Sequence, residues 1–206
     1  TVQRIREFGA DVLCFRLDVY GIQQAIEWIR VVKARTGLPV IAGGIAMSDY
    51  PADCMTRVEI DYGLSGEAVR RLPRLLEILE AGDDLAGLDE IDGLSHRVDG
   101  EVRSTPPNDD LVPFDDYPFP ARHLLPNDVY KSFVSQRRNF TVMLASTGCP
   151  FKCVYCAIVP VPHRLRSAES GIEELEHCVR EHGVREIGFF EASFLVNRER
   201  SMQPMQ

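Results

Sequence analysis

The chain has 206 residues, of which 45% are hydrophobic, and a formal net charge of −8. Its length allows one large core or two modest ones. The acidic balance argues against a nucleic-acid or anionic-membrane surface as the main partner, so we expect the chain to act on small molecules or another protein. No apolar run approaches the ~18 residues that a membrane-spanning helix requires, and no signal peptide is visible at Thr1.

The six cysteines are clustered rather than spread in pairs. That pattern is typical of intracellular metal or redox chemistry and not of a secreted disulfide framework, so we expect a cytoplasmic protein. The chain begins with Thr1 instead of a methionine, and it stops at the letters SMQPMQ directly after a strand and loop pattern. We therefore expect it to be a fragment of a longer protein.

The first 82 residues alternate strand and helix patterns with short connections. Apolar runs rich in β-formers alternate with segments whose apolar residues recur at helical spacing, and glycines and prolines separate them. The pattern predicts strands over 10–17, 39–44 and 58–64, helices over 21–36 and 73–82, and a short helix opened by Pro51. Such an order predicts a parallel sheet wound by right-handed crossovers.

The middle of the chain has a different sequence pattern. Asp99-Gly100 lies between two alternating segments, which is a strong hairpin signal. The proline-dense stretch that follows, 104–126, predicts a linker laid along a surface rather than regular structure. A disordered tether is the alternative, but interleaved large apolar side chains favour a docked linker: Phe114, Tyr117, Phe119 and Leu124.

The last third returns to the α/β pattern. Residues 140–146 predict a strand, a cysteine-rich loop follows it, and the letters VREIGFFEASF predict a second strand. Between them, Ser170 and Glu173 form a capping box that predicts a helix ending at Gly183. Its predicted apolar stripe comprises Ile172, Leu175 and Val179.

The cysteine-rich loop carries the clearest chemical signal. Cys149, Cys153 and Cys156 are spaced C-x3-C-x2-C. Three thiolates are too few for a closed four-ligand site around zinc or an iron–sulfur cube, so they would leave one metal position open for a substrate or cofactor. The loop also follows a strand, and the carboxyl ends of strands are where α/β folds place their chemistry.

Other interpretations of the cysteines remain open at this point. A zinc site could be completed by His163 or Cys178. Inert buried thiols are a further alternative, although Lys152 and the turn residues around it are not typical of a core. Cys14, Cys54 and Cys178 lie in strand or helix patterns, and we expect them to be small core residues.

The segment GCPFKCVYC resembles the cluster loop of the radical S-adenosylmethionine (SAM) superfamily. The resemblance implies that Cys149, Cys153 and Cys156 hold a [4Fe–4S] cluster whose open iron SAM chelates. It places Tyr155 near the SAM adenine. It also places Glu191, after the second strand of the barrel, near the amino group of the SAM methionine; a plain surface carboxylate is the alternative for this residue.

The front part resembles the cobalamin-binding Rossmann-like domain that precedes the radical SAM barrel in a large subclass of that superfamily. The resemblance rests on the stretch from ADVLCFRLDVYG to IDYGLSGEA, and it implicates Gly43, Gly44, Gly66 and Glu67 in binding the cobalamin nucleotide tail. Glycine lets a backbone approach a ligand closely, and helix N-termini favour phosphate. A plain turn is the alternative for each glycine.

Together, the resemblances imply an α/β chain: a flavodoxin-like parallel-sheet domain over 1–82, a connecting segment over 83–138, and the first strands of a partial TIM-type barrel over 139–206. They imply an enzyme that reductively cleaves SAM to functionalise an unreactive carbon, by methyl transfer in the first place and by radical oxidative cyclisation or rearrangement as the alternative. A small-molecule substrate and an electron donor such as flavodoxin or ferredoxin would be its partners. An iron–sulfur module without catalytic activity is the alternative from another class.

Overall fold

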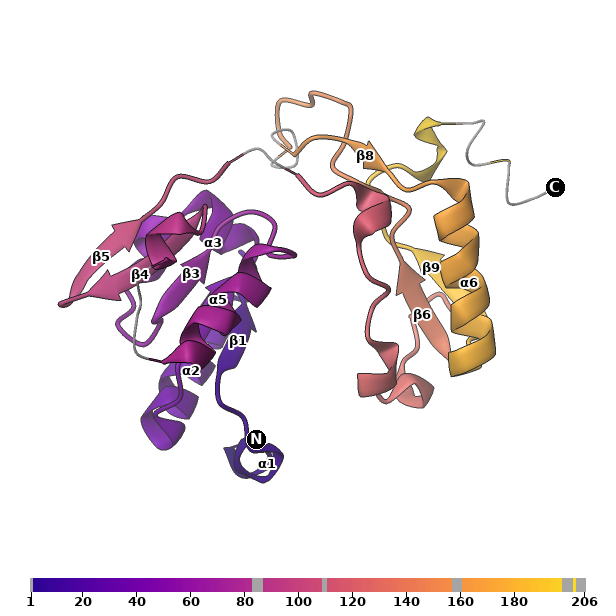
Figure 1. The fold of residues 1–206 in the computed structure, drawn as a ribbon. Helices are drawn as coiled ribbons and strands as arrows, with labels where there is room; N and C mark the ends of the chain where they lie inside the picture. Colours follow the sequence, from indigo (N-terminus) through magenta and orange to yellow (C-terminus); the bar gives the residue numbers. More distant parts are fainter. Residues whose placement is uncertain (1, 83–86, 109–110, 157–160, 198–201, 203–206) are drawn as a thin grey trace. The chain divides into compact units, whose positions relative to one another are not determined.

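A computed structural model describes residues 2–82, 87–108, 111–156, 161–197 and 202 (Figure 1). The chain divides into two compact units, Thr1–Leu111 and Val112–Gln206, which are described separately below. Within the described residues, no helix is both long enough and apolar enough to cross a membrane.

The first unit is built on a sheet in the order β1-β2-β3-β4-β5. Strands β1, β2 and β3 are parallel, as the alternating pattern predicts, and Ile41 lies opposite Tyr62 in the β2–β3 pair. Strands β4 and β5 form the predicted hairpin, whose turn has positive φ at both Asp99 and Gly100. The hairpin extends the sheet, because β4 pairs antiparallel with β3. The strands are Leu13–Arg16, Val40–Gly43, Tyr62–Leu64, Leu94–Val98 and Glu101–Ser104.

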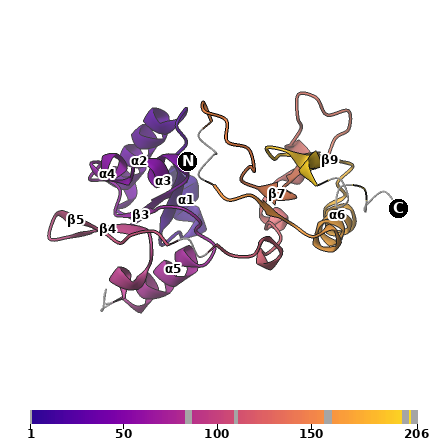
Figure 2. The ribbon, with the colours of Figure 1, turned by 90° about the horizontal axis from the view of Figure 1, so that it is seen from above.

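Helices cover both faces of this sheet. Figure 2 shows α2, α3 and α4 on one face and α5 on the other. The predicted helix over 21–36 is confirmed as α2, which ends at Gly37 in the left-handed conformation. The short helix at Pro51 is confirmed as α4, whereas the sequence pattern missed α1. The helices are α1 Val2–Phe8, α2 Ile22–Thr36, α3 Ile45–Asp49, α4 Pro51–Met55, α5 Arg71–Ala81 and the 3₁₀ turn η1 Leu88–Glu90.

Two apolar clusters fill the space between these layers. One packs the face under α2, α3 and α4 and includes Ile29, Met47 and Cys54; the other packs the face under α5 and includes Leu75. Cys54 is therefore a core residue as predicted, but Cys14 is exposed, contrary to the prediction. Strand β1 lies at the edge of the sheet, where one face of a strand is easily left open.

The second unit contains a parallel βαβ unit. Strand β6 (Phe140–Met143) leads through the cysteine-rich loop to α6 (Ala168–His182), and β9 (Glu186–Phe189) returns to pair with β6. This order confirms the predicted strand, helix and strand. A two-stranded antiparallel ribbon flanks the loop, formed by β7 (Ser146–Thr147) and β8 (Arg164–Leu165). Short 3₁₀ turns complete the unit: η2 Phe114–Asp116, η3 Arg122–Leu124, η4 Asn127–Val129 and η5 Phe194–Val196.

Helix α6 begins earlier than its sequence pattern predicts, and the residues on its buried face differ from the predicted stripe. Ser167, not Ser170, is the N-cap, because the Ser167 side chain accepts a hydrogen bond from the Ser170 amide. Val179 of the predicted stripe is exposed, whereas Glu174 and Cys178 are buried. The buried face is thus rotated by about one residue, because the helix packs around an ionic contact of Glu174 as well as around apolar side chains.

The proline-dense segment packs onto the second unit. The guanidinium carbon of Arg166 lies 5.7 Å from the ring centre of Phe114 and 5.4 Å from that of Phe119. The Asp115 carboxylate accepts a hydrogen bond from the Ser167 amide at 2.9 Å. Leu124, also expected to dock, does not pack against the unit, since it is 74% exposed. The segment from 112 to 123 is therefore docked against the βαβ unit.

Candidate functional site

The cysteine-rich loop leaves the carboxyl end of the β6–β7 segment through a turn that only glycine fits. Gly148 has φ +69°, and a Cβ added there would lie 2.2 Å from the carbonyl oxygen of Pro162. Further along, the Cys156 amide donates to the Cys153 carbonyl at 3.1 Å, which folds the end of the motif into a turn. The loop therefore begins and ends in tight turns around the three thiols.

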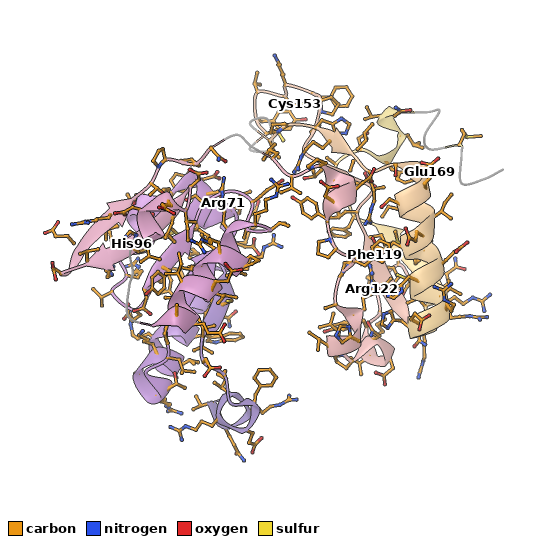
Figure 3. All side chains as sticks on the ribbon, in the orientation of Figure 1. Arg71, His96, Phe119, Arg122, Cys153 and Glu169 are labelled. Atoms are coloured by element: carbon orange, nitrogen blue, oxygen red, sulfur yellow. The ribbon has the colours of Figure 1, made fainter. Side chains whose placement is uncertain are left out.

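The three loop thiols are free and reachable. Cys153, labelled in Figure 3, is exposed, and Cys149 and Cys156 are partly exposed. They do not converge: among the described residues no three His, Cys, Asp or Glu side chains gather as a metal-binding group. The donor set nevertheless fits an iron–sulfur cluster chemically, because three accessible thiols on one short loop are the ligands such a cluster takes.

The fourth ligands considered for zinc differ in their placement. Cys178 is fully buried in a small core with Met143 and Val184, and burial raises the pKa of its thiol above the ordinary range. It cannot join the loop thiols without unfolding α6. His163 lies at the other end of the loop, half-buried, and within the described part of the chain its Nε2 has no hydrogen-bond partner. Among the described residues, His163 and the three loop thiols do not gather as a metal-binding group either.

Tyr155 and Glu191 lie in different surroundings. The Tyr155 ring is 89% exposed on the loop. Glu191 follows β9, and its carboxylate accepts hydrogen bonds from the Ala145 amide at 3.2 Å and from the Ser146 hydroxyl. The carboxylate is therefore fixed at the carboxyl end of β6, three residues before Cys149. That contact gives Glu191 a structural role whether or not it also meets a ligand.

The glycine turns of the first unit lie at one edge of its sheet. The Ser48 hydroxyl, which follows the Gly43-Gly44 turn, accepts a hydrogen bond from the Gly66 amide at 2.8 Å. The Ser65 hydroxyl donates to the Met47 carbonyl at 3.0 Å. The expected proximity of the two turns is thus present, at the carboxyl edge where parallel α/β sheets bind ligands.

The fold itself accounts for two of these glycines. Gly44 has φ +97°, and a Cβ there would lie 2.9 Å from the carbonyl oxygen of Leu17. Gly66 has φ +76° and lies against the Arg71 guanidinium, where a Cβ would meet Nη1 at 3.0 Å. Gly43 differs, because its φ is ordinary and the nearest atom to an added Cβ, the Leu64 carbonyl oxygen, is 3.8 Å away. A Cβ at Gly43 would therefore make an ordinary van der Waals contact without a clash.

Residues that sequence reasoning missed hold both regions in place. Arg71, labelled in Figure 3, donates to the Ser65 carbonyl at 2.6 Å and to the Asn108 side chain at 3.0 Å. These contacts fix the turn that contains Gly66 and the half-buried Glu67. In the second unit, buried Arg122 and Arg166 both contact the Glu174 carboxylate. The tertiary contacts of these long side chains leave no local sequence signal; an acidic residue four positions before Cys178 is the only hint.

Comparison with solved structures defines the fold class. The chain matches a radical SAM methyltransferase, TsrM from Kitasatospora setae, over 98% of its length, with a TM-score of 0.66 and 18% identity. It matches the cobalamin-dependent SAM radical enzyme OxsB over 98% of its length, with a TM-score of 0.72 and 16% identity. The matches cover 41% and 28% of those chains. The chain therefore has the α/β fold of cobalamin-dependent radical SAM enzymes across nearly all its residues.

One curated relative is closer in sequence. It is an uncharacterized methyltransferase, PH0819 from Pyrococcus horikoshii, 31% identical over 203 residues. The alignment covers 96% of this chain and 43% of the relative, so the chain spans less than half the length of that protein. No protein-family model matches the chain.

Proposed function

We propose that this chain is part of a cobalamin-dependent radical SAM enzyme that functionalises an unreactive carbon by methyl transfer. One observation carries the proposal: the C-x3-C-x2-C loop leaves the carboxyl end of β6, in a chain whose fold is that of such enzymes. The name of the Pyrococcus relative favours methyl transfer over cyclisation. A small-molecule substrate and a flavodoxin or ferredoxin as electron donor complete the proposal.

Each loop residue has a role in this proposal. Cys149, Cys153 and Cys156 would be the thiolate ligands; all three are free, and Cys153 is exposed while the other two are partly exposed. When bound, a [4Fe–4S] cluster with one open iron supplies the electron for reductive cleavage of SAM. Exposed Tyr155 stacks against the adenine, and Glu191, already held at the end of β6, accepts from the methionine amino group.

The first unit holds cobalamin at the edge formed by its two glycine turns. Gly43 and Gly44 would lie on one side of the nucleotide tail, and Gly66 and Glu67 on the other. The lack of a close contact at Gly43 and the hydrogen bond between Ser48 and Gly66 support this arrangement. The cobalamin part comprises residues 1–82, the connecting segment 83–138, and the radical SAM part 139–206.

Anaerobic reconstitution of the full-length protein with iron and sulfide tests the cluster. We expect one [4Fe–4S] cluster per chain and SAM cleavage to 5′-deoxyadenosine on reduction. Cys149→Ala, Cys153→Ala and Cys156→Ala should each lose both, whereas Cys54→Ala, a buried cysteine of the other unit, should keep both. Full cluster occupancy in Cys153→Ala would contradict the ligand assignment, and a cluster without SAM cleavage in the wild type would favour a non-catalytic module.

Titration with cobalamin tests the glycine edge. Gly43→Val adds a side chain at the edge of the sheet, where an added Cβ meets no atom closer than 3.8 Å and the backbone conformation is ordinary, so it should weaken cobalamin binding about tenfold and leave the cluster unaffected. Gly21→Ala, an ordinary-φ glycine without neighbours within 4 Å, is the matched control. Unchanged cobalamin affinity in Gly43→Val would mean that the two turns only shape the fold.

A further inference from the structure

The carboxylate of Glu191 is held by two donors from one short segment of the chain. Its Oε1 accepts from the Ala145 amide at 3.2 Å, and its Oε2 accepts from the Ser146 hydroxyl. Glu191 lies 45 residues after Ser146, just beyond the end of β9. The contact therefore links the carboxyl ends of two strands, β6 and β9, that pair side by side.

Ser146 is itself buried and held by the backbone around it. Only 1% of the residue is exposed. It lies opposite Leu165 in the β7–β8 ribbon, and the Arg166 amide donates to the Ala145 carbonyl at 2.9 Å. The hydroxyl group therefore meets Glu191 from a fixed position in the chain.

The chemistry of the contact suits a carboxylate that binds a cation. Both partners of Glu191 are donors, and an ionised carboxylate is a group that only accepts. These donors use two of its roughly four lone-pair positions, and the residue is partly exposed, so the carboxylate can accept a further donor from outside the fold. An ammonium group is the kind of donor that forms a strong, charge-assisted hydrogen bond with such an acceptor.

Ser146 also begins the segment that leads into the cysteine loop. Only Thr147 and Gly148 separate it from Cys149. The backbone at Gly148 leaves no room for a Cβ, so the path from Ser146 to the first thiol is short and sterically restricted. The residue that holds the carboxylate thus lies at the start of the loop.

We propose that Ser146 is a positioning residue, which orients the Glu191 carboxylate toward the amino group of SAM. The inference rests on the proposed function, in which Glu191 accepts from that group. Without the hydroxyl, the carboxylate keeps only the Ala145 amide and gains freedom to rotate. Binding of SAM must then also order the carboxylate, which lowers the affinity. Ser146 acts only through Glu191 and touches neither SAM nor the cluster.

SAM binding to the reconstituted full-length protein tests this role. Ser146→Ala should raise the Kd for SAM about tenfold and leave the cluster content unchanged. Glu191→Ala should raise it at least as much. Adding Ser146→Ala to Glu191→Ala should change the Kd by less than about twofold, because the hydroxyl then has no carboxylate to orient. Ser95→Ala, at a buried serine of the first unit that is hydrogen-bonded to Ser104, should leave the Kd unchanged.

An analogue of SAM that lacks only the amino group separates positioning from a general effect on the fold. The wild type and Ser146→Ala should bind this deamino analogue equally, and hydrogen exchange in β6 and β9 should be the same in both. A loss of affinity for the analogue as large as that for SAM would overturn the role, because it would mean that the variant distorts the loop. An unchanged Kd for SAM in Ser146→Ala, or an effect that persists undiminished beside Glu191→Ala, would also overturn it.

The proposed function can fail separately from this role. Wild-type protein that holds no cluster or binds no SAM would overturn both. An unchanged Kd for SAM in Glu191→Ala would remove the proposed role of Glu191, and with it that of Ser146, but not the assignment of the cluster. A raised Kd in Glu191→Ala without one in Ser146→Ala would overturn the positioning role alone.

Discussion

The two units of the chain are stabilised by different kinds of contact. In the first unit, two apolar clusters fill both faces of a five-stranded sheet. In the second unit, the apolar cluster is confined to Met143, Cys178 and Val184 with the partly buried side chains around them. A buried ionic group of Arg122, Arg166 and Glu174 lies beside it.

This difference has consequences for how each unit responds to mutation. Apolar packing loses stability in proportion to the volume removed, so the first unit should tolerate most polar changes at its surface. A buried ion pair behaves otherwise, because removing one partner leaves an uncompensated charge in a low-dielectric interior. The second unit should therefore be most sensitive at a charged position.

The largest expected effect is at Glu174. Glu174→Gln keeps the shape of the side chain but removes the charge of the buried carboxylate that Arg122 and Arg166 both contact, which should cost about 3–5 kcal/mol of stability. Hydrogen exchange followed by mass spectrometry should show faster exchange in β6 and α6 and no change in α2. Exchange in α6 as slow as in the wild type would contradict a stabilising role for the ionic group.

The same helix offers a matched control. Glu181 also pairs with an arginine, Arg180, at 2.8 Å, but both side chains are at least half exposed. Exposed pairs contribute little because water and salt screen them. Glu181→Gln should leave hydrogen exchange in the second unit unchanged, which would assign the effect of Glu174→Gln to burial.

The next effect is in the first unit, at Gly44. Gly44→Ala places a Cβ 2.9 Å from the Leu17 carbonyl at a φ of +97°, and the combined strain should cost roughly 1–3 kcal/mol. Urea unfolding can be followed by the fluorescence of Trp28, the only tryptophan in the sequence, which lies in α2 of this unit. Gly43→Ala, with no neighbour closer than 3.8 Å, should change stability by less than about 0.5 kcal/mol.

Local signals in the sequence were sufficient for most of the fold. Glycines and prolines at element ends predicted α2, α4 and the β4–β5 hairpin, because these residues act through their own backbone conformation. Contacts distant in sequence were not predictable in the same way. Helix α6 is capped at Ser167 instead of Ser170, and Glu174 lies on its buried face. Both differences from the prediction involve the docked segment, because Asp115 accepts from the Ser167 amide and Arg122 donates to the Glu174 carboxylate.

In the candidate site, too, the features set by local sequence could be predicted and those set by distant contacts could not. The three thiols could be found from their spacing alone, whereas their exposure and lack of convergence could not. The proximity of the two glycine turns followed from parallel pairing of their strands, which the structure confirms. Gly44 could not be distinguished from Gly43 in the sequence, because only three-dimensional packing shows which glycine the backbone requires.

The smallest expected effect is a dependence of the first unit on pH through His96 in β4. The side chain is 3% exposed, and within the described chain its Nδ1 has no hydrogen-bond partner. Burial lowers the pKa of His96 below its usual value; Asp89, 3.6 Å from Nε2, opposes this, and Arg103 on β5 adds to it. The folded protein therefore binds this proton less readily than the unfolded chain does.

The sign of the effect follows from that difference. Well above about pH 6.5 the imidazole is neutral in both states, and as the pH falls the unfolded chain takes up the proton first, so the free energy of unfolding should decrease. Urea unfolding monitored by Trp28 between about pH 8 and about pH 5 should show this decrease, and His96→Gln should reduce it. His123→Gln, at an exposed histidine of the other unit, should not. An unfolding free energy whose pH dependence is the same in His96→Gln as in the wild type would show that the buried imidazole contributes nothing to it.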